Sequence, residues 1–376
     1  MPALTEEERA IVAVVADFVD NQVRPVARDL EHANTYPEEL IEQMKRFGVF
    51  GLLAPAEYGG VDVSAACFVT VAEELARGWM SLAGAMGSHS VVTYLIRTFG
   101  TPAQRETYLP RMATGEIRAA MALTEPGGGS DLQAMTTTAT PDGDDLILRG
   151  AKTWITNVRR AGLVAVLCRT SEGFAVVLVE AGAGYEVSRD LPKLGYKGVE
   201  SCEVRFDDVR VPASAALGDD MVRGFAQMMR GLEIGRVNVA ARAVGVAQAA
   251  FDDALRYAQE RHSFGVPIWQ HQSVGNYLAD AATKIRAARL LTLDAAQRID
   301  EGERADLEAG MAKLFASEVC LEVTTNALRI HGGYGYSTEF DVERYFRDAP
   351  LMVVGEGTNE IQRNVIVRQL IHRHGS

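Results

Sequence analysis

The chain contains little cysteine and an excess of acidic over basic side chains, and both features exclude functions. Its 4 cysteines among 376 residues form no C-x-x-C pair, which argues against a zinc site and against a disulfide framework, so we expect buried thiols. The 50 acidic and 38 basic side chains give a formal net charge of -12. Because contacts to phosphate need a basic face, this charge argues against binding to nucleic acid or to an anionic membrane surface.

Long hydrophobic runs are also missing. No apolar stretch reaches the roughly 18 residues of a transmembrane helix. The first residues are acidic (Glu6, Glu7 and Glu8), whereas a secretory signal begins with basic residues. These features predict a cytoplasmic protein without a membrane span. Hydrophobic residues nevertheless make up 47% of the chain, which suffices for a sizeable core. The length of 376 residues suggests two to three domains or one large one.

Glycine is the residue type in excess. The chain has 35 glycines among 376 residues, about 9% where about 7% is usual. A scattered excess would indicate ordinary loops. Clustered glycines would instead indicate places where the backbone approaches a phosphate or a cofactor closely.

The spacing of apolar residues changes twice along the chain and predicts three domains. Residues 1–118 show helical periodicity broken by glycines. Residues 119–215 consist of short runs rich in Thr, Val and Ile, and residues 216–376 return to long alanine-rich helical stretches. We therefore predict an α+β multidomain protein with an N-terminal all-α domain, a central β-sandwich or barrel domain, and a C-terminal four-helix bundle.

Local signals support this division. Thr5 and Glu8 have the spacing of a capping box at a helix start. Asp142 and Gly143 form the dipeptide that is typical of a tight hairpin between two strands. Thr358 is suited to cap the last helix.

Two clusters, a run of three glycines and a segment around a tryptophan, lie in the predicted β-domain. Gly127–Gly129 can bring backbone N–H groups close to an anion such as pyrophosphate, although the same residues would also suit a plain flexible loop. Neither a Walker loop nor G-x-G-x-x-G spacing is present. Further on, Trp154 lies between two threonines. It is either a core residue of a strand or an aromatic plane beside a flat cofactor, with Thr156 hydrogen-bonded to that cofactor.

Two more clusters follow the ends of long predicted helices. Arg261 begins the first, Arg-His-Ser-Phe-Gly, and His271 and Gln272 follow shortly after. Its arginine and glycine fit ordinary helix capping, but the arginine could equally bind a diphosphate. The second, His331–Tyr336, contains three glycines, whereas a helix C-cap needs only one.

The last cluster places a carboxylate between two glycines. Glu356 lies between Gly355 and Gly357, after an apolar run and before the last predicted helix. It is either a solvated loop residue or, if desolvated, a group of raised pKa that can serve as a general base.

Taken together and in this order, the five clusters resemble the acyl-CoA dehydrogenase family. The matching pieces also include Gly224-Phe225, Arg236 and the run Val342–Asp348. The resemblance covers nearly the whole chain and includes the helical–β–helical order. It implies a flavoenzyme that binds FAD.

The resemblance also assigns roles to residues. Those that match FAD-contacting positions are Leu123, Thr124, Gly129 and Ser130 at the flavin and its phosphates; Trp154, Ile155 and Thr156 at the isoalloxazine ring; Arg261, Ser263, Phe264, His271, Gln272, Arg329 and Gly333 across a dimer; and Thr358 and Glu360 at the last helix. Those that match positions near the thioester substrate are Ser130, Glu233, Arg236, Gly355 and Gly357.

Glu356 matches the catalytic base of most family members. By this resemblance it would remove the α-proton of an acyl-CoA while flavin N5 takes the β-hydride, which yields a trans-2-enoyl-CoA. The thioester carbonyl would be polarised by hydrogen bonds from the base's own backbone N–H and a ribityl hydroxyl. The implied setting is fatty-acid β-oxidation by a homotetramer, a dimer of dimers, that passes electrons to an electron-transferring flavoprotein.

Four residues depart from common family patterns or bear on specificity. Gly235 occupies the position where a minority of members carry the base, which favours Glu356 as the base. Glu233 replaces a shorter Asp that contacts the CoA arm, and Arg329 replaces a Gln that contacts FAD. Gly355 stands where straight-chain enzymes often carry Tyr, so its lack of a side chain favours a branched, cyclic or bulky acyl group unless another side chain fills the space.

Three alternative functions remain open at this stage. The same desaturation could act on an acyl group carried by a carrier protein in biosynthesis. The fold could also serve a flavin oxidase or oxygenase, although oxygenases of this fold lack the base. Finally, a non-enzymatic scaffold would predict a colourless protein. No metal site is expected.

Overall fold

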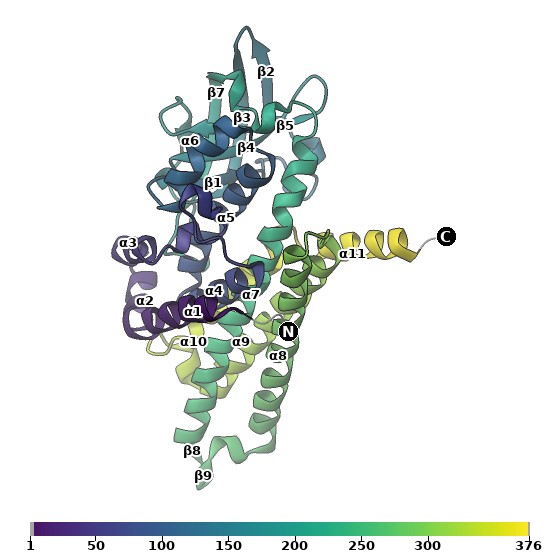
Figure 1. Ribbon diagram of the computed structural model, residues 1–376. Coiled ribbons are helices and arrows are strands. Elements are labelled where there is room, and N and C mark those ends of the chain that lie inside the picture. Colours follow the sequence, from purple (N-terminus) through teal and green to yellow (C-terminus); the bar gives the residue numbers. More distant parts are fainter. Residues whose placement is uncertain (1–3, 375–376) are drawn as a thin grey trace.

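The computed structural model describes residues 4–374 and has the predicted order of helices, sheet and helices (Figure 1). The predicted fold class is confirmed. The helices of the N-terminal part are α1 (Glu6–Phe18), α2 (Arg24–His32), α3 (Glu38–Arg46), α4 (Ala65–Gly78), α5 (Met80–Phe99) and α6 (Pro102–Ala113). The predicted capping box opens α1, where the Thr5 side chain accepts from the Glu8 backbone N–H and the Glu8 side chain accepts from that of Thr5.

The central region is one curled sheet of mixed strand direction. Its strands are β1 (Ala119–Ala122), β2 (Thr138–Asp142), β3 (Asp145–Thr156), β4 (Leu163–Arg169), β5 (Phe174–Glu180), β6 (Glu186–Val187) and β7 (Ser201–Pro212). β4 runs parallel to β1 and β2 along one edge and antiparallel to β5 along the other. The predicted hairpin at Asp142-Gly143 joins β2 to β3, and Gly143 has a φ of 64°.

The C-terminal part consists of long helices and one small hairpin. Its elements are α7 (Gly224–Glu260), β8 (His262–Ser263), β9 (Val266–Pro267), α8 (Gln272–Asp300), α9 (Asp306–His331), α10 (Val342–Val354) and α11 (Asn359–His374). α7 has 37 residues, so at 1.5 Å per residue it is about 55 Å long. In Figure 1 it runs from the sheet to the hairpin β8–β9 at the opposite end of the molecule.

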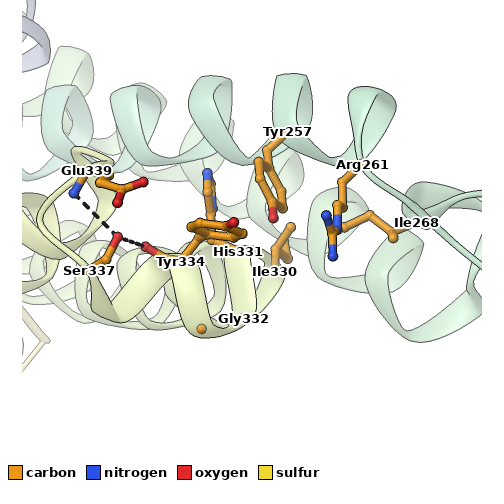
Figure 2. Close-up of a pocket in the computed structure, with 10 residues that line it drawn as sticks. Tyr257, Arg261, Ile268, Ile330, His331, Gly332, Tyr334, Ser337 and Glu339 are labelled. Carbon is orange, nitrogen blue, oxygen red and sulfur yellow. Dashed lines mark hydrogen bonds between the residues drawn. The ribbon is translucent and has the colours of Figure 1, made fainter.

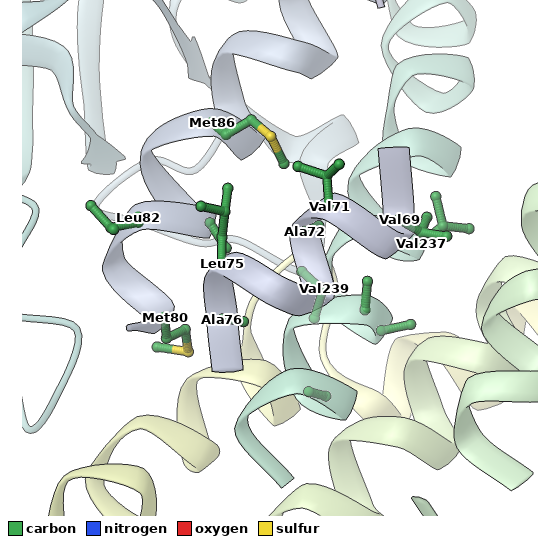
Figure 3. Packing of buried hydrophobic residues seen from close by; sticks show 14 of the residues in the cluster. Val69, Val71, Ala72, Leu75, Ala76, Met80, Leu82, Met86, Val237 and Val239 are labelled. Carbon is green, nitrogen blue, oxygen red and sulfur yellow. The ribbon is translucent and has the colours of Figure 1, made fainter. Parts of the chain in front are cut away.

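Two hydrophobic cores hold the chain together. One fills the interior of the sheet region, and the other joins the N-terminal and C-terminal helices. Figure 3 shows part of the second core, where α4 with Val69, Ala72 and Leu75 packs on α7 with Val237 and Val239. α5 and α7 also contact strands β1 and β5, so these two helices connect the helical body to the sheet.

Two predictions from the composition, on the cysteines and on membrane-spanning helices, can be compared with the described residues. Cys67, Cys168, Cys202 and Cys320 are all buried free thiols, as predicted. Among the described helices, none combines the length and the apolar character that crossing a membrane requires.

Candidate active site

Glu356 occupies the turn between α10 and α11 and has a left-handed backbone conformation, with a φ of 53°. Its Oε2 atom is buried and has no hydrogen-bond partner within residues 4–374. Gly235 of α7 lies against the carboxylate, since a Cβ at this glycine would be 2.6 Å from Oε2. The lack of a side chain at position 235 therefore makes room for the Glu356 carboxylate.

The surroundings of this carboxylate favour a proton acceptor. Burial raises the pKa of Glu356, and the positive charges of Arg242, Arg236 and Lys313 partly offset that rise. A desolvated carboxylate of raised pKa is a stronger base than a solvated one. The alternative of a solvated loop glutamate does not fit this buried oxygen.

Two side chains fix the backbone that carries the carboxylate. Lys313 of α9 donates from Nζ to the carbonyls of Val353 (3.0 Å) and Gly357 (2.9 Å). Gln362 of α11 donates from Nε2 to the carbonyls of Glu356 and Gly357, each at 3.1 Å. Burial lowers the pKa of Lys313 to about 8. The turn is thus held from two helices, which restricts where the carboxylate can point.

Trp154 and Thr156 lie at the end of β3, where the strand is irregular. The pairing of β3 with β7 shifts register between Lys152 and Ile155, and Trp154 has a φ of 61°. As a result the indole leaves the sheet and is 56% exposed, while Ile155 is buried in the core of the sheet region. Trp154 is therefore not a core tryptophan, and only the backbone of Ile155 can face a ligand.

The glycine run lies directly beside this strand end. The backbone N–H of Thr153 donates to the carbonyl of Thr124 at 2.8 Å, which brings the first two sequence clusters together. Leu123 is buried, whereas Gly129 and Ser130 are exposed. The structure thus gathers the residues that were predicted to meet the flavin and its phosphates.

A buried ion pair anchors the glycine run. Lys152 Nζ lies 3.0 Å from Glu125 Oε1, and both side chains are buried. Burial would raise the pKa of Glu125, but hydrogen bonds from Thr137 and Thr136 outweigh it and hold this pKa at about 2. The ends of the run are fixed, although a Cβ at Gly127 would have no neighbour within 4 Å.

Tyr196 connects the strand end to the carboxylate. Its buried phenol lies near enough to the Thr156 side chain and to Glu356 for both to act on its pKa, which burial raises. Its hydroxyl lies against α5, because a Cβ at Gly84 would be only 1.7 Å from it. The β-region cluster and the base therefore meet around this tyrosine.

The predicted substrate-binding residues near the start of α7 are engaged in ion pairs. Glu233 Oε1 accepts from Arg304 at 2.8 Å, and Oε2 accepts from Arg230 at 2.6 Å. Arg236 Nη1 lies 3.2 Å from Asp306. Because both oxygens of Glu233 are occupied, any contact of this residue with a CoA arm would also involve Arg230 or Arg304.

The remaining residues of the turn lie beside Glu356. The Thr358 hydroxyl accepts from the backbone N–H of Ile361 at 3.3 Å and caps α11, as predicted. Glu360 is exposed on the first turn of α11. A Cβ at Gly355 would have only the Leu351 carbonyl within 4 Å, at 3.1 Å, so no side chain occupies the space next to it.

The other predicted cofactor residues lie far from this site. Ser263 belongs to β8, Phe264 to the turn before β9, and His271 and Gln272 to the start of α8. Ser263 Oγ lies 2.9 Å from His271 Nε2. Phe264 is 98% exposed and has a φ of 52°. The length of α7, about 55 Å, separates this hairpin from the sheet (Figure 1).

A pocket of about 540 Å³ links the hairpin to the His331–Tyr336 cluster (Figure 2). Arg261 and Gly333 both line it, and His331 stacks on Tyr257 with ring centroids 4.2 Å apart. Arg329 lies in a neighbouring groove, where its guanidinium is 4.7 Å from the ring centroid of Tyr277. The residues predicted to act across a dimer thus form a second group at the far end of α7.

Three residues of the site were not singled out in the sequence. Lys313 lies in an alanine-rich helix, Tyr196 in an irregular loop, and Arg242 is a single arginine in a run of alanines and valines. A signal existed only for Arg242, because it lies seven residues after Gly235 and so on the same face of α7. For the other two, only the tertiary structure shows their role.

Comparisons with known proteins agree with this geometry. The models of the acyl-CoA dehydrogenase N-terminal, middle and C-terminal domains match residues 5–116, 120–209 and 222–371. The chain is 37% identical to a 3-(aryl)acrylate reductase of Clostridium sporogenes, over 98% of this chain and 99% of that protein. It is 38% identical to a (2S)-methylsuccinyl-CoA dehydrogenase of Cereibacter sphaeroides, over 98% of this chain and 70% of that one.

The fold agrees as well. The structure of butyryl-CoA dehydrogenase from Megasphaera elsdenii superposes with a TM-score of 0.96 at 34% sequence identity, and the match covers 99% of this chain and 100% of that one. Matches to all three domain models account for most of the chain, and the relatives include enzymes that oxidise and enzymes that reduce. The chain is therefore an enzyme that belongs to the acyl-CoA dehydrogenase family.

Proposed function

We propose that this enzyme uses FAD to introduce an α,β double bond into an acyl-CoA, and that Glu356 removes the α-proton. The observation that carries this proposal is the buried Oε2 of Glu356, which faces Gly235 and has no hydrogen-bond partner among the described residues. A buried carboxylate oxygen without a hydrogen-bond partner costs folding free energy, and groups whose pKa is shifted in this way cluster at functional sites, so Glu356 is a strong candidate for a general base.

The residues around the base would each contribute to the reaction. Glu356 accepts the proton, and the turn held by Lys313 and Gln362 keeps its carboxylate aimed at the α-carbon. The backbone N–H of Glu356 would polarise the thioester carbonyl, which makes the α-proton more acidic. When bound, FAD would supply the acceptor for the β-hydrogen.

The chain offers residues that fit FAD in two places. Trp154 presents an exposed aromatic face beside Thr156, and the neighbouring glycine run leaves its backbone accessible for phosphates. Arg261 lies at the far end of α7, 26 residues or about 39 Å beyond Gly235, and Phe264 lies in the hairpin that follows. One chain cannot place both groups on one cofactor, so we infer that the hairpin reaches the FAD of a second copy. A homotetramer built as a dimer of dimers would satisfy this requirement.

The substrate proposal starts from the open space at Gly355. Apart from its two chain neighbours, no side chain among residues 4–374 lies within 4 Å of a Cβ placed there, and this favours a branched or otherwise bulky acyl group. A (2S)-methylsuccinyl-CoA dehydrogenase among the relatives supports this direction by its name. We propose an electron-transferring flavoprotein as the electron acceptor. One relative is named a 3-(aryl)acrylate reductase, so the reverse reaction, reduction of an α,β double bond, is the alternative to test.

Anaerobic flavin reduction tests the proposal. Purified enzyme should be yellow, and its flavin absorbance should bleach when a suitable acyl-CoA is added. Glu356→Gln should keep FAD and acyl-CoA binding but lower the rate of bleaching by at least about 10²- to 10⁴-fold, because it removes the base. A variant that still bleaches at the wild-type rate would refute the assigned base.

The same assay separates the alternatives. Bleaching by an acyl carrier protein thioester but by no acyl-CoA would favour the carrier-protein reaction. Rapid peroxide formation by the reduced enzyme would favour an oxidase. Oxidation of the reduced enzyme by an enoyl-CoA, without bleaching by the saturated thioester, would show that the enzyme works as a reductase.

A further inference from the structure

Arg242 is a buried cation to which the proposed function assigns no contact with substrate. Its side chain is 8% exposed, and its Nε atom is buried without a hydrogen-bond partner. Within residues 4–374, no carboxylate forms an ion pair with its guanidinium. By contrast, Arg236, less than two helical turns earlier, lies 3.2 Å from Asp306. A buried guanidinium without a counter-charge is unfavourable unless a ligand supplies one.

The Arg242 guanidinium lies between its own helix α7, helix α5 and the ring of Tyr196. A Cβ at Gly87 of α5 would be 3.8 Å from Arg242 Nη1, so the arginine faces α5. The Tyr196 ring covers another side, with its centroid 5.3 Å from the guanidinium carbon. Among nearby charges, Arg242 has the largest effect on the pKa of Glu356, which it lowers. Arg242 therefore borders the same space as the base.

Asn238 adds a second polar group on this side of the helix. It is one helical turn before Arg242, is 2% exposed, and has a buried Nδ2 atom without a hydrogen-bond partner. A Cβ at Gly87 would be 2.8 Å from its Oδ1. Gly87 thus leaves room for both side chains, and together they present N–H donors from a guanidinium and an amide.

The direction of α7 indicates which part of a substrate would reach these donors. The N-terminal end of the helix approaches the surface, since Glu233 pairs with Arg304, whose side chain is 65% exposed. From position 231 to 247 every residue of α7 is buried. An acyl-CoA that enters beside Glu233 would therefore pass Gly235 and Glu356 first and reach Arg242 with the far end of its acyl chain.

We propose that Arg242 and Asn238 bind a carboxylate at the distal end of the acyl group, so that the substrate is the CoA thioester of a short dicarboxylic acid. This inference rests on the proposed function, because it places the reacting carbons at Glu356. A carboxylate is the ligand that a guanidinium binds best, with two parallel N–H donors. It would also give the guanidinium a hydrogen-bonded carboxylate partner, which it does not have among the described residues.

The test compares pairs of substrates that differ only in this group. Succinyl-, glutaryl- and adipoyl-CoA are each paired with the acyl-CoA in which an isopropyl group of similar shape replaces the carboxylate. The measurement is the rate of anaerobic flavin bleaching over a range of thioester concentrations. The wild-type enzyme should favour one dicarboxylic thioester over its isopropyl partner by about a hundredfold or more in kcat/KM, since the isopropyl group leaves both donors unpaired.

Variants show whether Arg242 causes this preference. Arg242→Met should lower the ratio of kcat/KM between the dicarboxylic thioester and its isopropyl partner by about a hundredfold. Arg242→Lys keeps the charge and should recover part of the preference. Asn238→Leu, of nearly the same shape, should have a smaller effect in the same direction. FAD content and elution volume confirm that each variant is folded.

Two outcomes would overturn the inference, and they can be told apart. If the wild type bleaches equally well with both members of every pair, or if Arg242→Met slows both members equally, Arg242 does not bind a carboxylate but the proposed dehydrogenation stands. If no thioester bleaches the flavin of an FAD-loaded enzyme, both the inference and the proposed function fail.

Discussion

The two ends of helix α7 differ in how complete they are within one chain. In the first third of the helix, Gly235 lies against the buried Oε2 atom of Glu356, whose turn is fixed by Lys313 and Gln362. At the other end, the hairpin exposes 98% of Phe264. The base is thus positioned by the chain's own packing, whereas the hairpin presents a large apolar side chain for which the chain provides no cover. Under the proposed function, this difference leads us to expect that one subunit suffices to position the base, whereas cofactor binding requires a second subunit.

The largest effect on the rate of flavin reduction is expected from a substitution at Gly235, where α7 packs against the Glu356 carboxylate. A methyl group at Gly235→Ala would lie 2.6 Å from Glu356 Oε2 and must displace the carboxylate. Because a displacement of about 1 Å can cost about 10²-fold in rate, we expect flavin reduction to slow by about that factor. The melting temperature should not fall, since alanine favours a helix over glycine by about 1 kcal/mol. Stopped-flow bleaching and thermal unfolding measure the two quantities.

Gly310→Ala in α9 is the matched control for this prediction. A Cβ there would meet its nearest neighbours at 3.4 Å, an ordinary contact. This variant should gain the same helical stability without a loss of rate. Unchanged rates in both variants would mean that the Glu356 carboxylate is not confined by α7.

The sequence predicted the individual clusters at the two ends of α7 but not how the fold groups them. The clusters at Gly127–Gly129 and Glu356 could be found because they lie in loops, where their residue types stand out against the helices and strands. Trp154 lies in a strand and could be noticed because the chain has only 3 tryptophans. Their grouping could not be predicted, because it depends on α7, which brings Gly235 to the base and places Arg261 about 39 Å further along the helix. The sequence also did not predict the register shift in β3 that exposes Trp154, since no residue type next to Trp154 indicates an irregular strand.

The helices were the more predictable part of the fold. The long alanine-rich stretches in the last third correspond to α7, α8 and α9, and the cap at Thr358 precedes α11. The sequence did not separately predict α10, which contains Pro350 near its end. It also missed Arg242 and Lys313, because buried charges follow no periodic pattern and acquire meaning only from what surrounds them.

A smaller effect is expected at the exposed end. Phe264→Ala should weaken FAD binding by roughly 5- to 30-fold, because loss of an aromatic anchor at an interface costs about 1–2 kcal/mol. Unfolding of the FAD-free chain should hardly change, since the ring makes little contact within its own chain. FAD titration, with light scattering for the oligomeric state, checks this prediction. Val14→Ala, which truncates an exposed side chain of α1, serves as the control and should change neither quantity.

The smallest expected effect is on the pH dependence of the packed end. Glu356 must be unprotonated to accept the α-proton, so flavin reduction should fall on the acidic side as this group binds a proton. Burial raises its pKa, and Arg242, Arg236 and Lys313 lower it. Arg242→Met removes one of these positive charges, so the pKa of Glu356 should rise and the acidic limb of the profile should move to higher pH.

Arg242→Lys keeps the positive charge and should leave that limb near its wild-type position. The isopropyl-ended thioester is the substrate for this measurement, because it does not call on the arginine for binding. Tyr196 also faces the base, but burial raises its pKa, so it should not titrate on the acidic side. An acidic limb that stays in place in Arg242→Met would mean that this arginine does not act on Glu356 through its charge. Its unpaired guanidinium would then have to be explained by the distal end of the substrate alone.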